Sequence, residues 1–451
     1  MKLATIILAA GQGTRMKSEL PKVLHPVAGR SMVSYVIDTA VALGDERPTL
    51  VVGYRADQVR AAIGDRVEYV DQPEQLGTGH AVMQARGALE GRSDVVLVLY
   101  GDTPFVSAET LRAMLDEHAG HDAAITLLTF RPPDPLRYGR IVRSGSGRVV
   151  NIVEFKEATP EQLTLREVNS GILCFEAGWL WPHLNQLQPK HGHGEYYLTD
   201  LVALAAAEVK TIATREATTE EVGGIDDRVR LAWAERLMRE RIAERLMLSG
   251  VTIVDPSNST ISAEATIEPD TTIYPGSHVE GATHIGRGCH IGPNTIVRDS
   301  VIGERCRIES SVVEGATLEG DVRVGPFAHL RSGAYLERGV ECGNFAEVKN
   351  SRLGAGTKQH HFSYLGDATL GRKVNVGAGA ITCNYDGAKK HHTDIGDGAF
   401  IGSDTMLVAP VRVGAGSQTG AGSVVTRDVA DGELVYGVPA RPKPKPPESS
   451  A

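Results

Sequence analysis

The chain has 451 residues, more than one ordinary hydrophobic core holds, so two or more domains are expected. Its net charge is −9, from 47 basic and 56 acidic residues, and it has no long basic run. This balance argues against nucleic acid as the main partner but leaves phosphorylated small molecules open. The five cysteines form no CxxC pair, which predicts reduced thiols in a cytoplasmic protein.

The first ten residues are mostly apolar and could be either a short signal peptide or a buried first strand. The glycine-rich run over residues 11–15 follows at once and favours the strand. No stretch is long enough to span a bilayer, so no membrane partner is expected.

Up to about residue 225, strand-like runs alternate with helix-like runs. Strands are expected at 3–10, 49–52, 95–100, 123–129 and 172–175, and helices at 31–43, 78–89 and 107–118. This alternation predicts a mostly parallel, Rossmann-like sheet covered on both faces, an α/β domain over residues 1–227. From Arg228 onwards, apolar residues recur every four or five positions among Arg and Glu, which predicts a linker helix within residues 228–250.

After Gly250 the apolar residues recur at every sixth position, in three long runs that begin at Ile261, Leu318 and Ile395. This period, with small residues between, is typical of a parallel β-helix of hexapeptide repeats, here expected over residues 251–441. The period falters between about 349 and 394, where polar and His-containing segments suggest loops recruited for function. The Pro/Lys-rich residues 442–451 are expected to be a disordered tail.

The glycine-rich turn over residues 8–16 is not a Walker A motif, and Met16 stands where a dinucleotide fingerprint has its third glycine. Its backbone N–H groups, with Arg15 and Lys22, predict a cradle for a triphosphate. Asp102 follows the strand at 95–100, where ligands bind in open α/β sheets, and is a candidate Mg²⁺ ligand. Taken alone, Asp102 is better explained as a turn residue or a helix N-cap.

These motifs, with those at 21–22, 72–79, 100–102, 138–140, 154 and 169–171, resemble the nucleotide-sugar pyrophosphorylase family. The resemblance implies that UTP, or the UDP-sugar product, binds to Leu8, Ala9, Ala10, Gly11, Lys22, Gln72, Gly77, Thr78, Tyr100, Gly101 and Asp102, and the sugar to Gly139, Glu154 and Asn169. A sugar 1-phosphate oxygen attacks the α-phosphorus of UTP, so Arg15, Lys22 and Mg²⁺ would offset phosphate charge and no protein base is required. Asp226 is expected as the second metal ligand, where the family usually has Asn; the added charge could weaken UTP binding at low metal.

The segment at 358–367 resembles the acetyltransferase half of the bacterial family of bifunctional N-acetylglucosamine-1-phosphate uridyltransferases/glucosamine-1-phosphate acetyltransferases. That family joins a pyrophosphorylase domain, a helix and a left-handed β-helix in this order, and the resemblance covers residues 1–440. It implies that His361 is the general base, with Glu347 as its carboxylate partner. The implied ligands of glucosamine 1-phosphate are Arg331, Lys349, Tyr364, Asn375 and Lys390, and those of acetyl-CoA are Ala378, Asn384, Tyr385, Ser403 and Ala421.

Some features keep alternatives open. His361 alone could be an ordinary surface histidine, and His360 competes for the role of base, although His361 keeps the family spacing to Tyr364. The run at 437–441 departs from the family pattern, so the cation that meets the CoA phosphates is not assigned.

The resemblance implies acetylation of glucosamine 1-phosphate by acetyl-CoA, followed by Mg²⁺-dependent uridylyl transfer from UTP to N-acetylglucosamine 1-phosphate. It also implies a homotrimer and a role in making precursors of peptidoglycan and lipopolysaccharide. Two other classes of function are weighed: a single pyrophosphorylase site with a purely structural β-helix, and a sugar-nucleotide binding protein without turnover. Arg15, Lys22 and Asp102 argue against the binding protein, and His361, Lys349, Tyr364 and Asn384 against the structural β-helix.

Overall fold

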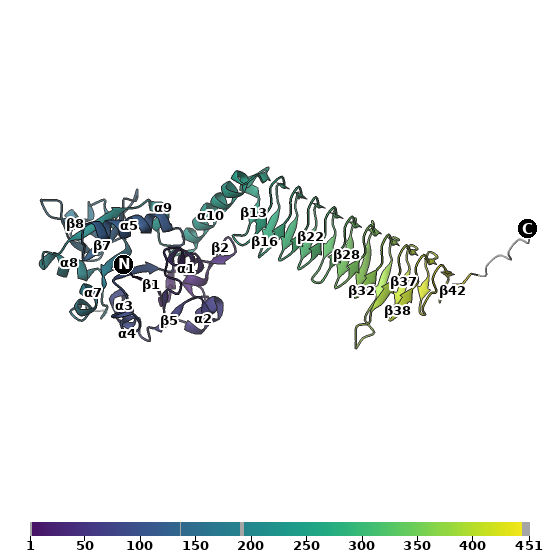
Figure 1. Ribbon diagram of the computed structural model, residues 1–451, viewed down its shortest axis with the longest axis horizontal. Coiled ribbons are helices and arrows are strands. Elements are labelled where there is room, and N and C mark those ends of the chain that lie inside the picture. The colour runs from purple at the N-terminus through teal and green to yellow at the C-terminus, as the bar shows by residue number, and fades with distance from the viewer. Residues whose placement is uncertain (1, 136, 190–193, 444–451) are drawn as a thin grey trace, which may run out of the picture. The chain divides into compact units, whose positions relative to one another are not determined.

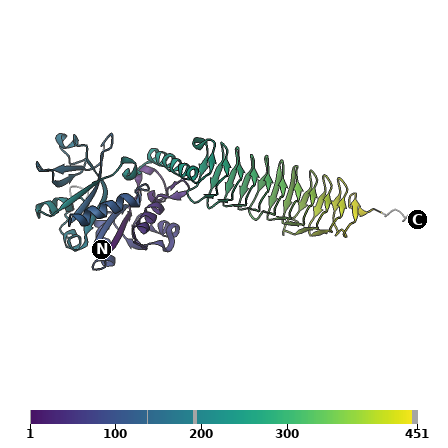
Figure 2. The ribbon, with the colours of Figure 1, turned by 45° about the horizontal axis from the view of Figure 1, so that its top comes forward.

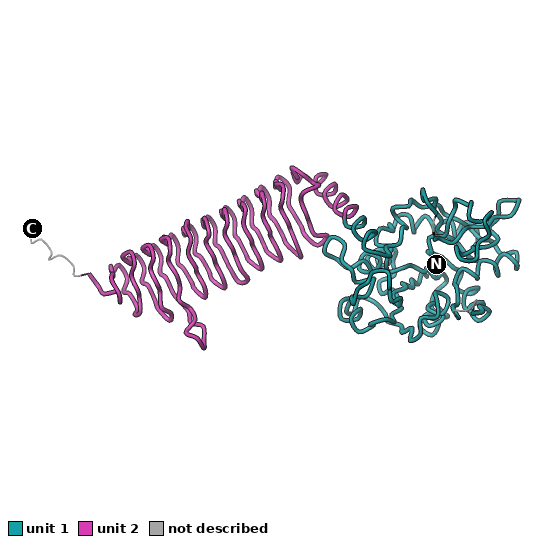
Figure 3. The backbone as a smooth tube through the Cα atoms, turned by 180° about the vertical axis from the view of Figure 1, so that it is seen from behind, with its two compact units in different colours: residues 1–235 teal, residues 236–451 magenta. Residues whose placement is uncertain are grey.

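A computed structural model describes residues 2–135, 137–189 and 194–443. The chain divides into two compact units, residues 1–235 and residues 236–451 (Figure 3). The helix α10 (Arg228–Leu248) coincides with the predicted linker, and the division between the units falls inside it.

The first unit is built on one twisted sheet with the strand order β11-β7-β10-β6-β1-β4-β5. Its strands are β1 (Leu3–Ala9), β4 (Thr49–Val52), β5 (Glu68–Asp71), β6 (Val95–Tyr100), β7 (Ile125–Phe130), β8 (Arg140–Arg143), β9 (Val149–Val153), β10 (Val168–Glu176) and β11 (Ile212–Glu216). The strand β10 runs antiparallel to both of its long neighbours, β6 and β7, whereas β1 is parallel to β4 and β6. The prediction of a mostly parallel α/β sheet is confirmed.

Helices cover both faces of this sheet because successive residues of its central strands point to opposite sides. The helices are α1 (Met32–Ala42), α2 (Ala56–Ile63), α3 (Thr78–Gln84), α4 (Arg86–Leu89), α5 (Ala108–Gly120), α6 (Pro160–Leu163), α7 (Ala177–Leu184), α8 (Asp200–Ala207) and α9 (Thr219–Val222). Ile7 packs with α1 and α5 in one core, and Ile6 packs with α3, α7 and α8 in the other. The helix predicted at 78–89 is two helices, α3 and α4, which separate at Ala85.

The second unit is a left-handed parallel β-helix, whose stacked coils are visible in Figures 1 and 2. Three ladders of short strands form its three faces. The first face contains β12 (Thr252–Ile253), β15 (Thr272–Ile273), β18 (His290–Ile291), β21 (Arg307–Ile308), β24 (Arg323–Val324), β27 (Glu341–Cys342), β30 (Lys358–Gln359), β33 (Asn375–Val376), β36 (Phe400–Ile401), β39 (Gln418–Thr419), β41 (Leu434–Tyr436) and β42 (Arg441–Pro442). The second face contains β13 (Thr260–Ile261), β16 (His278–Glu280), β19 (Ile296–Arg298), β22 (Val312–Glu314), β25 (His329–Leu330), β28 (Ala346–Lys349), β31 (Ser363–Gly366), β34 (Ile381–Cys383), β37 (Met406–Val408) and β40 (Val424–Val425). The third face contains β14 (Thr266–Ile267), β17 (His284–Ile285), β20 (Val301–Ile302), β23 (Thr317–Leu318), β26 (Tyr335–Leu336), β29 (Arg352–Leu353), β32 (Ala368–Leu370), β35 (Thr393–Ile395) and β38 (Val411–Val413).

The faltering of the six-residue period has two structural causes. First, polar residues replace aliphatic ones inside the stack: Gln359 stands between Cys342 and Val376, and Thr382 stands between Leu365 and Leu407. Both side chains are fully buried and hydrogen-bonded within the coil; the Gln359 amide donates to Ser363 Oγ at 2.9 Å. Second, extra residues between β34 and β35 form a loop, residues 384–392, that projects from the coils near β32 in Figure 1.

The end of the chain pairs back on the β-helix through β42, which runs antiparallel to β41. Of the tail predicted at 442–451, residues 444–451 lie outside the described part of the chain. Within the described part, no helix combines the length and the apolar character that crossing a membrane requires.

Two candidate active sites

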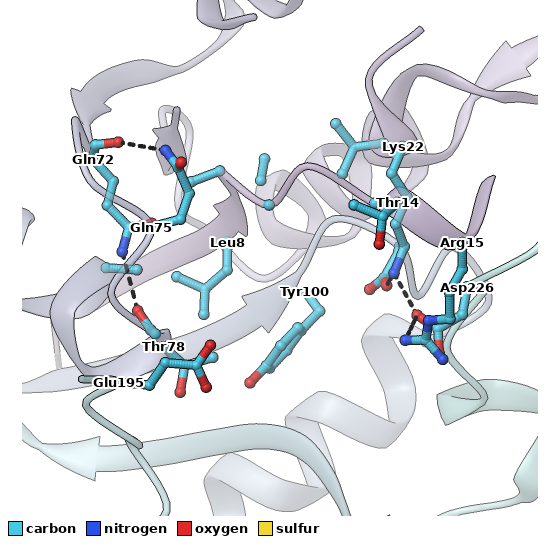
Figure 4. Close-up of a pocket in the computed structure, with 18 residues that line it drawn as sticks. Leu8, Thr14, Arg15, Lys22, Gln72, Gln75, Thr78, Tyr100, Glu195 and Asp226 are labelled. Carbon is cyan, nitrogen blue, oxygen red and sulfur yellow. Dashed lines mark hydrogen bonds and ion pairs between the residues drawn. The ribbon is translucent and has the colours of Figure 1, made fainter. Parts of the chain in front are cut away.

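A cleft of about 440 Å³ opens where β1 and β6 end at their carboxyl termini. It is lined by Leu8, Ala9, Ala10, Gly11, Gly13, Thr14, Arg15, Lys22, Val23, Gln72, Gln75, Gly77, Thr78, Ala81, Tyr100, Asp102, Glu195 and Asp226. In Figure 4, Arg15, Lys22 and Asp226 lie at one end of the cleft and Gln72 and Gln75 at the other. Most of the predicted nucleotide-binding residues therefore share one cavity, with Arg15, Lys22 and Asp226 together at one end and Glu195 beside Thr78 away from them.

The glycine turn after β1 packs directly on Lys22. Gly13 has a φ of 63°, in the left-handed region, and a Cβ there would lie 2.6 Å from the Lys22 Cβ. Only glycine meets both conditions without strain, so this glycine lets the turn and Lys22 line the same end of the cleft.

The ammonium of Lys22 joins the two predicted metal ligands. It forms ion pairs with Asp102 and with Asp226, the latter at 2.6 Å, and Arg15 Nη2 lies 3.0 Å from the same Asp226 oxygen. Burial disfavours the charged form of Lys22, but the two carboxylates outweigh it and raise its pKa. Burial likewise opposes ionisation of Asp226, and Lys22 and Arg15 overcome it, so its pKa is lowered. These contacts thus favour the charged forms of Lys22 and Asp226 at this end of the cleft.

The chemistry of these donors fits Mg²⁺, which takes oxygen ligands from one or two carboxylates and completes its shell with water and substrate phosphates. Asp102 and Asp226 converge on one point, the Lys22 ammonium. Among the described residues, no group of three His, Cys, Asp or Glu side chains could hold a metal by itself. The fit is therefore to a cation shared with a phosphate, and Lys22 would have to give up at least one of its two partners.

Four predicted residues, Gly101, Gly139, Glu154 and Asn169, are not part of the cleft wall. Three of them nevertheless lie close to the Tyr100 region. A Cβ on Gly139 would lie 3.4 Å from a Glu154 carboxylate oxygen, and burial, Glu154 and Asp102 together raise the pKa of Tyr100. Asn169 Oδ1 accepts a hydrogen bond from the Gly171 N–H at 3.0 Å, and Gly171 itself packs on the Tyr100 ring.

Sequence reasoning missed some of the cleft. Glu195 lies in it although it comes from the segment after α7, for which the sequence offers no strand, helix or motif signal. Gln75 lies inside the motif at 72–79; its amide donates to the Gln72 carbonyl at 3.2 Å, and the Gln72 amide donates to the Gly77 carbonyl at 3.0 Å. The motif at 72–79 is therefore held together by its own side chains.

On the second face of the β-helix, β25, β28 and β31 bring several predicted sugar-phosphate residues together. Glu347 pairs with Tyr364 in the ladder, and its carboxylate accepts a hydrogen bond from Arg331 at 2.8 Å. The positive charges of Lys390 and Arg331 lower the pKa of the half-buried Lys349. Arg331, Lys349 and Lys390 thus concentrate positive charge in one place, which favours binding of a phosphate dianion.

His361 is exposed at the corner between β30 and β31. Within the described chain, Glu347 is bound to Arg331 and no hydrogen bond joins it to His361. The neighbouring His360 behaves differently, because its Nε2 lies 3.0 Å from the Glu341 carboxylate. Of the two candidates, His361 is thus the one whose imidazole is not held in a surface ion pair.

The predicted acetyl-CoA residues follow the same corner along successive coils. Gln359, Val376 and Ile401 are stacked in register on the first face, so His361, Ala378 and Ser403, each two positions further, form a column. Ala421 continues this column one coil later. Asn384 and Tyr385 begin the projecting loop.

One predicted sugar-phosphate residue, Asn375, lies apart from the others. It belongs to β33 on the first face, and a single chain does not place it beside Tyr364 on the second face.

Comparison with known proteins agrees with this architecture. Residues 5–191 match the MobA-like NTP transferase domain, and residues 264–299 and 392–427 match the bacterial transferase hexapeptide family, with its six repeats. The fold and the two sites thus define a nucleotidyltransferase joined to a hexapeptide-repeat acyltransferase.

Three curated relatives are each named bifunctional protein GlmU, and come from Geobacillus sp. (strain WCH70), Pelobacter propionicus and Alkalilimnicola ehrlichii. They are 48%, 50% and 49% identical to this chain over 96% of its length and 95%, 95% and 93% of theirs. The chain belongs to the GlmU family of bifunctional proteins.

Both activities expected from the sequence follow from this membership. The chain is a bifunctional enzyme of UDP-N-acetylglucosamine synthesis, with an acetyltransferase acting on glucosamine 1-phosphate and a uridyltransferase acting on N-acetylglucosamine 1-phosphate. Its product is a precursor for cell-wall synthesis.

Proposed function

We propose that the cleft of the first unit binds UTP and N-acetylglucosamine 1-phosphate through the predicted residues, and that Arg15 and Lys22 carry the chemistry. The cluster formed by Lys22, Arg15, Asp102 and Asp226 is the observation that supports this assignment. When the sugar-phosphate oxygen attacks the α-phosphorus, negative charge builds on the transferring and leaving phosphates. Lys22 and Arg15 are placed to offset that charge, and the backbone N–H groups of the glycine turn can hold the phosphates in line.

We assign Mg²⁺ to Asp102 and Asp226, as enzymes of this kind generally use that ion. Bound there, the ion would neutralise phosphate charge beside the α-phosphorus. Lys22 would then exchange its contact with at least one carboxylate for a contact with phosphate.

For acetyl transfer, His361 accepts a proton from the amine of glucosamine 1-phosphate as that nitrogen attacks the thioester carbonyl of acetyl-CoA. The C–S bond breaks, and the CoA thiolate takes up the proton that His361 received. Arg331, Lys349, Tyr364 and Lys390 hold the sugar phosphate, while Ala378, Ser403 and Ala421 line the acetyl-CoA path along the corner from His361, with Asn384 and Tyr385 beside it.

We further propose a homotrimer in the cytoplasm. Asn375 lies on a different face from Tyr364, so the first face of a neighbouring copy could complete the sugar-phosphate site. Beside His361, the stacked rings of Phe327 and Phe345, with centroids 5.4 Å apart, are 58% and 64% exposed, and Phe362 is 57% exposed. We call these three residues the phenylalanine ridge. Exposed adjacent aromatic rings are typical of a surface that another protein covers.

The free cysteines agree with a reducing compartment.

Two variants test the assignment of two separate sites. His361→Ala should abolish acetyl transfer from acetyl-CoA and leave pyrophosphate release from UTP and N-acetylglucosamine 1-phosphate intact. Asp102→Ala should do the converse. Acetyl transfer is measured with acetyl-CoA and glucosamine 1-phosphate, and uridylyl transfer separately with UTP, N-acetylglucosamine 1-phosphate and Mg²⁺, each product being followed by mass spectrometry. Parallel loss of both activities in a folded variant would contradict the two-site assignment.

A further inference from the structure

The loop at residues 384–392 is folded on itself. Ala368 pairs with Thr393, 25 residues on, whereas Arg352 on the preceding coil pairs with Thr369, only 17 residues on. The extra residues close into a small hairpin with a bridge between Tyr385 and Lys390. Within it, the Asp386 carboxylate accepts hydrogen bonds from the Ala388 and Lys389 N–H groups and lies 2.6 Å from His391 Nε2.

One residue of the β-helix, Asp367, accepts hydrogen bonds from both ends of this hairpin. Its carboxylate accepts hydrogen bonds from the Asn384 amide, where the loop begins, and from the Asn350 amide at 2.6 Å. Its carbonyl accepts a hydrogen bond from the Thr393 N–H at 3.1 Å, where the loop ends. Asp367 has a φ of 49°, a left-handed conformation that Asp and Asn adopt more readily than most residues. Asp367 and Asn384 are only 9% and 8% exposed, so little water competes for these hydrogen bonds.

From these contacts we infer that Asp367 is a positioning residue for acetyl transfer, which fixes the 384–392 hairpin so that Asn384, Tyr385 and Lys390 meet the substrates. The inference rests on the proposed function, since that assigns these three residues to acetyl-CoA and to the sugar phosphate. Asp367 itself acts on the hairpin and takes no part in the chemical step. Loss of its carboxylate should therefore weaken substrate binding more than it slows acetyl transfer between the bound substrates.

The decisive variant is Asp367→Ala in the full chain, compared with Asp270→Ala. Asp270 is also a left-handed aspartate on the β-helix, but its carboxylate contacts Arg287 and not the hairpin. Hydrogen bonds to a buried charge justify an expected rise in the KM for acetyl-CoA of roughly 10- to 100-fold in the Asp367 variant, with a smaller fall in kcat. Uridylyl transfer should stay unchanged in both variants, which shows that the first unit has folded, and trypsin cleavage confined to the hairpin shows that the β-helix has folded.

Limited trypsin digestion measures the anchoring independently of catalysis, because Lys389 and Lys390 are exposed at the end of the hairpin. Cleavage after these two lysines should be faster in Asp367→Ala than in the wild type or in Asp270→Ala. Unchanged cleavage would overturn the inference, and so would faster cleavage with an unaltered KM. Failure of the proposed function is a separate result: His361→Ala would then retain acetyl transfer.

Exchanging the hydrogen-bond donor and acceptor between positions 350 and 367 tests whether the anchoring of the hairpin can be restored. Asp367→Asn leaves one acceptor for Asn384 but sets an amide against the Asn350 amide. In the double variant Asp367→Asn/Asn350→Asp, the amide at 367 can donate to a carboxylate at 350, where φ is 45°. The double variant should recover protease resistance and acetyl-CoA KM relative to Asp367→Asn. No recovery of either would also overturn the inference.

Discussion

The ammonium of Lys22 lies 2.6 Å from the carboxylate of Asp226, although 204 positions separate the two residues in the sequence. This contact brings the start of the chain against the segment just before α10, and it forms part of the proposed phosphate and metal site. Because the contact also engages the carboxylate that is proposed as the second metal ligand, the negative charge at position 226 can be tested by substitution.

Asp226→Asn removes one negative charge from this cluster while keeping an oxygen donor for the metal. The apparent affinity for Mg²⁺ should fall, and the KM for UTP at limiting Mg²⁺ should drop by about two- to fivefold, the size of effect expected for a partly exposed ion pair. The measurement is the initial rate of pyrophosphate release over a grid of UTP and Mg²⁺ concentrations. A higher UTP KM at every metal concentration would contradict this account.

Lys22→Ala should lower the kcat for uridylyl transfer by about 100-fold or more, because a preorganised charge aimed at the reacting phosphates is removed. Lys22→Arg keeps the charge and should recover part of the rate. Acetyl transfer serves as the internal control and should be unaffected. If extra Mg²⁺ restored the Lys22→Ala rate fully, Lys22 would only be filling the metal position.

The two adjacent histidines should behave differently. Loss of a general base costs typically 10²- to 10⁴-fold in rate, and we expect a loss of about that size for His361→Ala. His360→Ala should stay close to the wild type, since that imidazole is engaged with Glu341. Steady-state acetyl transfer across pH 5 to 9 compares them; an acid limb that disappears in His360→Ala would reverse the assignment.

Replacing the phenylalanine ridge tests the trimer. Phe327→Ser/Phe345→Ser should shift sedimentation from trimer towards monomer and remove acetyl transfer, while uridylyl transfer continues. Phe155→Ser, at a residue 42% exposed in the first unit, is the matched control and should do neither. Monomers of the double variant that still transfer acetyl groups would argue against a site shared between copies.

Glu167 supplies a stability test with a definite pH dependence. Its side chain is 10% exposed and lies 2.6 Å from Arg143 Nη2; burial opposes its charge, but Arg143 and Arg131 outweigh that and lower its pKa. A carboxyl whose folded-state pKa is depressed adds stability above its unfolded pKa, and that stability is lost as the pH falls through the folded value. Glu167→Gln should thus cost roughly 1–3 kcal/mol at pH 7.

Calorimetry of the full chain at pH 7 and at progressively lower pH checks this expectation. The difference between wild type and Glu167→Gln should start to shrink below about pH 4.5, the ordinary value for Glu, and vanish once the wild-type carboxyl is protonated. A difference that grew towards acid pH would contradict the sign.

Periodic and local signals in the sequence predicted much of the fold. The six-residue repeat predicted the β-helix, because each apolar position stacks on its equivalent in the next coil, and α10 lies within residues 228–250, where a helix was expected. The antiparallel placement of β10 could not be predicted, since strand order depends on tertiary packing. Glu195 and the role of Asp367 were also missed, because each depends on contacts between distant segments. Asn375 and Tyr364 show the same limit: the family resemblance assigned both to the sugar phosphate, but the coils of one chain place them on separate faces.

The polar side chains Gln359 and Thr382, which interrupt the aliphatic stack near His361, have a consequence for how the β-helix unfolds. In a solenoid each coil is supported only by its two neighbours, so strength varies link by link along the axis. The coils around His361 have hydrogen bonds where neighbouring coils have aliphatic contacts. They are therefore less stable than coils with an aliphatic residue at the same position. On heating, the β-helix should unfold first from these coils towards its C-terminal end. Acetyl transfer would then be lost while the coils on the N-terminal side remain folded.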